Sequence, residues 1–235
     1  MNMSKRTTMV AATALVFAAS TAQALQFKLP SALGGKNSAQ TSAAANEQAG
    51  DPATAQDSLV RTFVASQLEV LAAQSELAKA YDLNDQAAIL DSEQKALSGG
   101  GTLDATALQT SMDRSQAANE AISAKQAASS QLTAEGKQHY AASLPHFAKG
   151  VVGTRELVVQ ATHFTGAMKG SMTGGGLAGL AGGAGKLKAG VVVAKGTPAY
   201  SKSVFDVFRK TMSIGQSNGV KAPADATSAL GSMAP

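Results

Sequence analysis

Apolar residues recur every three or four positions over several long stretches of the chain, which is the spacing of an amphipathic helix. The first such stretch covers residues 53–81. Asp51 or Thr54 is suited to cap this helix, and Pro52 suits its first turn. Its inward-facing residues are expected to be Val60, Phe63, Val64, Leu68, Leu71, Leu77, Ala78 and Tyr81.

Two shorter helices are expected next. Asn84 is suited to cap a helix over about 85–98, and the run SGGG at 98–101 is a strong stop signal. Thr102 or Asp104 is expected to start the third helix. The inward residues are predicted to be Ala88, Ile89 and Leu97 in the second helix, and Leu108, Met112, Ala118 and Ile122 in the third.

The most regular pattern lies within residues 133–170, where apolar positions alternate in steps of four and three. This pattern predicts one long helix with a heptad seam. Pro145 lies inside it, so a kink or a break is expected near 141–145. The seam is predicted to contain Tyr140, Leu144, Phe147, Val151, Thr154, Val158, Ala161, Thr165 and Met168.

A last helix is expected over about 198–215, with Pro198 in its first turn. The tail at 221–235 is predicted to be irregular, with Asp225 able to cap a terminal turn. The pattern of the last helix, at 198–215, places five apolar residues on one side: Tyr200, Val204, Phe205, Phe208 and Met212. Together these elements predict an all-α fold, an irregular bundle of about five or six helices with a long kinked central helix.

The N-terminus has the pattern of a signal peptide. A basic start, MNMSKR, precedes a short apolar run, and Ala22 and Ala24 form an A-x-A cleavage site. Cleavage after Ala24 predicts a periplasmic or secreted protein of 211 residues. The domain organisation expected is a signal peptide at 1–24, a flexible segment at 25–52, a helical domain at 53–220 and a C-terminal tail at 221–235.

Composition narrows the chemistry. The chain contains no cysteine, which excludes disulfides and thiolate metal sites. The histidines are His139, His146 and His163, and no H-E-x-x-H motif joins them. We therefore expect no enzymatic activity, no catalytic residue, no resident metal and no cofactor; a metal or haem carrier using these histidines stays an alternative.

A glycine-rich segment covers residues 170–196. It lacks the preceding strand of a dinucleotide-binding loop and the Ser/Thr of a P-loop. Three interpretations stay open: a loop or linker, a close helix contact, and a hairpin that inserts into a membrane. Lys186 and Lys188 interrupt its apolar run, so no transmembrane span is expected. The residues suited to close packing or insertion are Gly175, Gly179 and Gly183.

Charge is unevenly distributed along the chain. Residues 25–135 contain seven Lys/Arg and thirteen Asp/Glu, whereas residues 136–235 contain eleven and three. The split favours either an anionic partner for the second half or internal complementarity between the halves. The residues expected to contact an anionic surface are Lys186, Lys188, Lys195, Lys202, Arg209 and Lys210.

The segments LPHFAKGVVGT and QSNGVKAPADAT resemble an uncharacterised family of secreted, helical proteobacterial proteins, over about residues 58–230. The resemblance implies no activity, ligand or site. We expect a non-enzymatic binding or scaffold protein of the cell envelope, with an anionic lipid, a polysaccharide surface or an envelope protein as partner and no specific nucleic acid. The alternative is a membrane-active protein that inserts the hairpin at 170–196.

Overall fold

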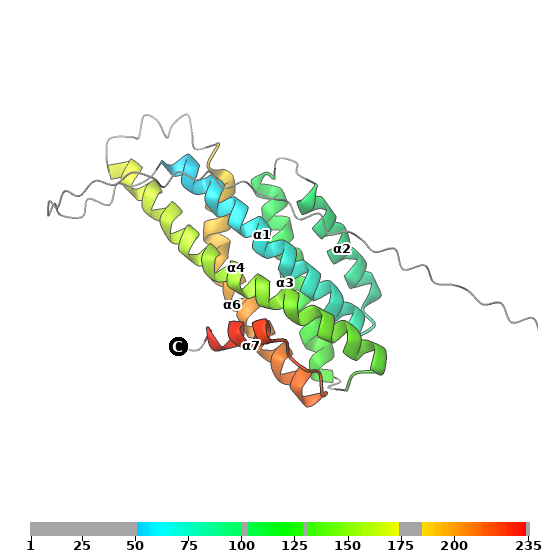
Figure 1. Cartoon of the computed structure of the whole chain (residues 1–235). Helices are drawn as coiled ribbons and strands as arrows, with labels where there is room; N and C mark the ends of the chain where they lie inside the picture. Colours follow the sequence, from blue (N-terminus) through cyan, green and yellow to red (C-terminus); the bar gives the residue numbers. More distant parts are fainter. Residues whose placement is uncertain (1–50, 100–102, 129–130, 174–184, 234–235) are drawn as a thin grey trace, which may run out of the picture. The chain divides into compact units, whose positions relative to one another are not determined.

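The computed structural model describes residues 51–99, 103–128, 131–173 and 185–233. The predicted signal peptide and most of the predicted flexible segment lie outside these residues. The described residues form helices and no strand, as expected (Figure 1). The helices are α1 (Pro52–Ala80), α2 (Asn84–Ser98), α3 (Ala105–Ala128), α4 (Ala134–Thr173), α6 (Lys188–Ser217) and α7 (Ala224–Gly231).

Helix α1 has the most packing partners, because it contacts α2, α3, α4 and α6. Its start agrees with the sequence: Asp51 accepts a hydrogen bond from the Thr54 backbone N–H at 3.0 Å, and Pro52 begins the helix. Phe63, Leu71 and Leu77 are buried as expected. The central place in the bundle is therefore shared between α1 and the long helix α4.

Helices α1 and α4 form a close antiparallel pair. A Cβ added at Gly153 would lie 3.0 Å from Ser66 Cβ, so the two backbones approach closely there. The Ser66 hydroxyl donates to the Gly150 carbonyl at 3.0 Å and lies 2.9 Å from Thr154 Oγ1. The small residues thus bring the two helices close enough for their buried polar groups to form hydrogen bonds with each other.

Of the kink or break expected near 141–145, the break does not occur, because helix α4 continues through Pro145. Proline removes one hydrogen bond from a helix interior. Tyr140, Leu144 and Phe147, on both sides of Pro145, are all buried. Packing of these large side chains keeps the helix continuous across the proline.

The seam of α4 follows the prediction from Tyr140 to Thr154 and then changes register. Leu157 is fully buried, whereas Val158 is 41% exposed, and Phe164 is buried in place of Thr165. Residues 157–159 are all apolar, so the next buried position after Thr154 could be Val158, four residues on, or Leu157, three residues on. The sequence fits both equally well. The larger leucine side chain takes the interior position.

Helix α2 packs against α1 and, less extensively, α3. The prediction that Ala88 and Ile89 face inward is wrong, because both side chains are exposed. Leu97 is buried as expected. The interior side of α2 instead contains Ala87 and Leu90. In α3, the predicted inward residues Leu108, Met112, Ala118 and Ile122 are all buried.

A row of buried polar side chains joins α1 to α3. Gln67 donates to the Ser111 carbonyl at 3.0 Å, and Gln74 donates to the Ser115 carbonyl at 2.9 Å and to Asn119 Oδ1 at 2.7 Å. Residue numbers increase together along this row, so α1 and α3 run parallel. Both glutamines are fully buried, a feature that a search for apolar stripes does not detect.

Helix α6 begins at Lys188, ten residues before the predicted start. Pro198 therefore lies inside the helix, not in its first turn. Beyond residue 220 the chain forms α7, which packs against α4 with Ala226 and Ala229 buried. Pro223, not Asp225, is the N-cap of α7; the Asp225 carboxylate accepts from the Ala226 N–H at 2.9 Å.

Candidate anionic-surface site

Four basic residues lie at seven-residue intervals along α6: Lys188, Lys195, Lys202 and Arg209. We call these four residues the basic stripe. Residues seven apart share a face of a helix, and the stripe extends over about 31 Å at 1.5 Å per residue. All four are exposed, and the other side of α6 packs into the core through Val193, Tyr200, Val204 and Phe208.

The stripe has one acidic neighbour within α6. Asp206 lies 2.6 Å from Lys202 Nζ and 3.7 Å from Arg209 Nη1. Arg209 also donates to the Met233 carbonyl at 3.1 Å. Exposed ion pairs of this kind contribute little to stability, and the Lys202 side chain remains 79% exposed. The Asp206 contacts therefore reduce, but do not cancel, the positive charge of the stripe.

The six basic residues predicted from the sequence separate into three groups, of which Lys202 and Arg209, the partners of Asp206, are the first. Lys210 is half-buried and donates to the Ser123 carbonyl at 3.1 Å, so it joins α6 to α3. Lys186, Lys188 and Lys195 are exposed and have no ion pair with any described residue. The positive charge that is free to meet a ligand is concentrated at the N-terminal end of α6.

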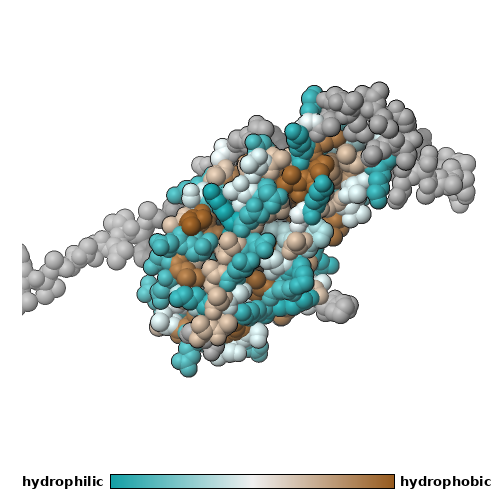
Figure 2. Space-filling view, turned by 180° about the vertical axis from the view of Figure 1, so that it is seen from behind, coloured by the Kyte–Doolittle hydropathy of each residue, from teal (hydrophilic) through white to brown (hydrophobic). Residues whose placement is uncertain are grey.

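The opposite charges of the two halves meet at the α1–α4 contact. Glu69 lies 3.9 Å from Lys149 Nζ and 2.7 Å from His146 Nδ1, and Glu76 lies 2.8 Å from His139 Nδ1. None of the ion pairs among described residues joins α6 to the acidic half. Internal complementarity thus involves α4, and the charged side chains of the basic stripe on α6 are exposed. Figure 2 shows hydrophilic side chains interspersed with apolar ones on the rear face.

A cavity of about 730 Å³ lies beside the first turn of α6. Lys186, Lys188 and Arg61 line it together with Asp57 and Asp104. The turn before α6 is held to α1, because Gln56 donates to the Lys186 carbonyl at 2.8 Å and accepts from the Gly190 N–H at 3.0 Å. Leu187, the N-cap, provides no side-chain hydrogen bond. Since helix N-termini favour negative charge, this end of α6 adds to the basic stripe.

The glycine-rich segment is described only at its ends. Gly175, Gly179 and Gly183 lie outside the described residues. Residues 189–194, the second arm of the predicted hairpin, lie in the first turns of α6, where Val193 is fully buried. A Cβ at Gly190 would lie 2.8 Å from Phe164 Cζ. This arm is therefore packed into the bundle, and among the described residues no helix is long and apolar enough to cross a membrane.

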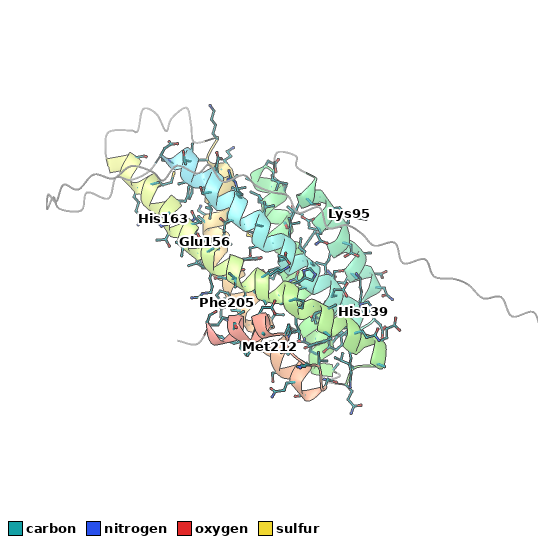
Figure 3. The ribbon with its side chains drawn as sticks, in the orientation of Figure 1. Lys95, His139, Glu156, His163, Phe205 and Met212 are labelled. Carbon is teal, nitrogen blue, oxygen red and sulfur yellow. The ribbon has the colours of Figure 1, made fainter. Side chains whose placement is uncertain are left out.

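The histidines do not converge. His139 and His146 each pair with a glutamate of α1, and His163 is exposed near the other end of α4 (Figure 3). The described part of the chain contains no group of His, Asp and Glu residues suited to hold a metal ion. The geometry gives His139 and His146 a role in joining α1 to α4.

All three tyrosines of the chain are buried, and burial raises the pKa of each, Tyr81 included. Burial raises the pKa of Tyr140 far above its usual value, although its hydroxyl donates to the Thr211 carbonyl at 2.8 Å. Burial likewise raises the pKa of Tyr200. Both hydroxyls therefore stay protonated inside the bundle.

The seven-residue spacing of the basic stripe is visible in the sequence. A count of basic residues does not reveal this spacing, so the residues were predicted from the sequence but their regular arrangement on one helix was not.

Comparison of this chain with protein-family models, with curated proteins and with solved structures finds no match.

Proposed function

We propose that the protein is a non-enzymatic binding or scaffold protein of the cell envelope, periplasmic or secreted, and that the basic stripe of α6 contacts an anionic envelope component. The observation that supports this proposal most directly is the set of exposed lysines Lys186, Lys188 and Lys195 at one end of α6, which form no ion pair with another described residue. Their charges are fixed on a helix whose other side is anchored in the core.

The spacing of the stripe suits an extended surface better than a small ligand. Consecutive charges lie about 10 Å apart along α6, and the side chains emerge on one side of the helix. Lipid head groups and acidic polysaccharides present many anionic groups at such separations. A lysine close to an anionic membrane surface contributes about 1 kcal/mol of binding free energy, and salt screens this contribution.

Flotation of the purified protein with lipid vesicles tests the proposal. The account expects binding to vesicles that contain an anionic lipid, loss of this binding in high salt, and no binding to neutral vesicles. A parallel pull-down on an acidic polysaccharide separates a lipid surface from a carbohydrate one. Absence of binding to both anionic materials at low salt would contradict the proposed function.

A further inference from the structure

A groove of about 620 Å³ runs between α4 and α6, beside the basic stripe: Pro198, which lines it, lies one helical turn from both Lys195 and Lys202. Most of its lining side chains are small, and none is a carboxylate. Lys169 provides the one charged side chain of the lining. Small residues on adjacent helices allow a third helix to approach closely. The lining includes Ala161, Thr165, Gly166, Ala194, Thr197 and Ser201.

Elsewhere on α4, a helix of the same chain already packs against the bundle. Helix α7 packs against α4 with Ala226 and Ala229 inward, and Arg209 of α6 donates to the Met233 carbonyl that follows α7 (Figure 1). The two buried residues of α7 are thus both small, and Leu230 packs half-buried beside them. A second helix with a similar face suits the groove that α7 leaves uncovered.

The rim of the groove is apolar and basic. Val158 lines the groove and is 41% exposed, and Val159 beside it is 47% exposed. Arg155 is exposed one helical turn before Val158. The occupant of this groove therefore needs an apolar contact and negative charge near it.

A face with these properties lies on α2 of the same chain. Ile89 is 45% exposed, and it is the one exposed large hydrophobic residue of the described chain outside α4. Its exposed neighbours Ala88, Ser92 and Ala96 are small, and Asp85 adds a carboxylate one turn before it. We call Asp85, Ala88, Ile89, Ser92 and Ala96 the α2 ridge.

The ridge and the groove lie on different helices and in halves of opposite charge. Helix α2 packs against α1 and α3, whereas α4 and α6 form the groove. Figure 3 shows Lys95, on α2, on the other side of the bundle from His163 and Glu156 on α4. The ridge of one molecule is therefore free to meet the groove of another.

We propose that copies of this chain associate head to tail, with the α2 ridge of one copy in the α4–α6 groove of the next. The contact is supported by shape, by the apolar residues Ile89 and Val158, and by the net charges of −6 for residues 25–135 and +8 for residues 136–235. Because the two surfaces differ, the contact is heterologous and repeats into a ring or an open filament. This inference goes beyond the proposed anion binding and does not depend on it.

Two variants each block one surface. Ile89→Asp places a charge on the ridge, at a position that is already exposed. Gly166→Leu fills the groove: a Cβ at position 166 meets no atom within 4 Å, and leucine favours a helix over glycine. Ala141→Leu, an exposed position on α4 outside the groove, is the matched control. Circular dichroism verifies that each variant is folded.

Sedimentation of the full-length protein over a range of concentrations, up to roughly millimolar, measures the assembly. The wild type and Ala141→Leu are expected to form species larger than a dimer at low salt. Each blocking variant alone is expected to associate at least about tenfold more weakly. An equimolar mixture of the two is expected to stop at a dimer, because one intact ridge and one intact groove remain.

Three results would overturn the inference: a monomeric wild type throughout, assembly that neither blocking variant weakens, or a mixture that forms no dimer. Vesicle flotation of Ile89→Asp and Gly166→Leu distinguishes the two proposals. Both variants keep the basic stripe, so their binding to anionic vesicles is expected to match that of the wild type whatever their assembly.

Discussion

Gly150 of α4 lies directly against Val70 of α1: a Cβ at position 150 would stand 2.7 Å from Val70 Cγ2 and 3.3 Å from its backbone nitrogen. The close approach of α1 and α4 at this point thus depends on the absence of a side chain at position 150. We predict that Gly150→Ala lowers the free energy of unfolding by about 1–2 kcal/mol, since overpacking costs more than the gain in helix propensity. Urea unfolding measures this change.

Gly166 is the matched control for this prediction, because its added Cβ meets open space on the same helix. Gly166→Ala is expected to raise the free energy of unfolding by up to about 1 kcal/mol. If the two substitutions shifted stability in the same direction by the same amount, the close contact at Gly150 would not be what determines the effect.

The buried glutamine row gives a second prediction. Gln74→Met keeps the volume of the side chain but removes the donor to the Ser115 carbonyl and to Asn119. Because buried polar groups without partners are costly, we expect a loss of about 1–3 kcal/mol in the free energy of unfolding. Gln109→Met, at an exposed position on α3, is expected to change it by less than about 0.5 kcal/mol. Equal effects of the two substitutions would argue against the row.

Glu76 gives a prediction about pH. Burial would raise the pKa of this carboxyl, but hydrogen bonds from His139 and Lys79 outweigh burial and lower it below its ordinary value of 4.5. Since the folded protein binds this proton less tightly than the unfolded chain, Glu76 contributes stability above pH 4.5. That contribution is lost as the pH falls through the folded-state pKa.

Replacement of Glu76 by glutamine removes this titration. We expect Glu76→Gln to make the free energy of unfolding depend less steeply on pH in the acid range, below about pH 5. Urea unfolding of both proteins across that range provides the comparison. An unchanged acid limb in Glu76→Gln would show that its contacts with His139 and Lys79 do not stabilise the fold.

Helix positions followed from the sequence wherever apolar spacing and end signals agreed. Asp51 and Pro52 begin α1 as predicted, and α2 ends at Ser98, with Gly99 as its C-cap. The inward face of α2 did not follow, because adjacent apolar residues such as Ile89 and Leu90 allow two faces. Only the position of α1 decides between them, and that position is not a local property of the sequence.

The start of α6 could not be predicted from local sequence preferences, because these preferences argue against a helix there. Glycines and Pro198 are unfavourable within an isolated helix, so residues 188–197 were grouped with the glycine-rich segment. In the fold, Val193 is buried and Gly190 lies against Phe164, so tertiary packing outweighs local propensity. This earlier start is what places Lys188 and Lys195 on the same helix as Lys202 and Arg209.

The most direct test of the anion-binding account compares two charge-matched variants by vesicle flotation at low salt. Lys188→Gln/Lys195→Gln removes half of the basic stripe, whereas Lys125→Gln/Lys137→Gln removes two exposed lysines from α3 and α4. With about 1 kcal/mol for each lysine, the stripe variant is expected to bind anionic vesicles about 30-fold more weakly, and the control to bind like the wild type. Equal losses in the two variants would mean that net charge alone attracts the protein and would contradict a defined site on α6.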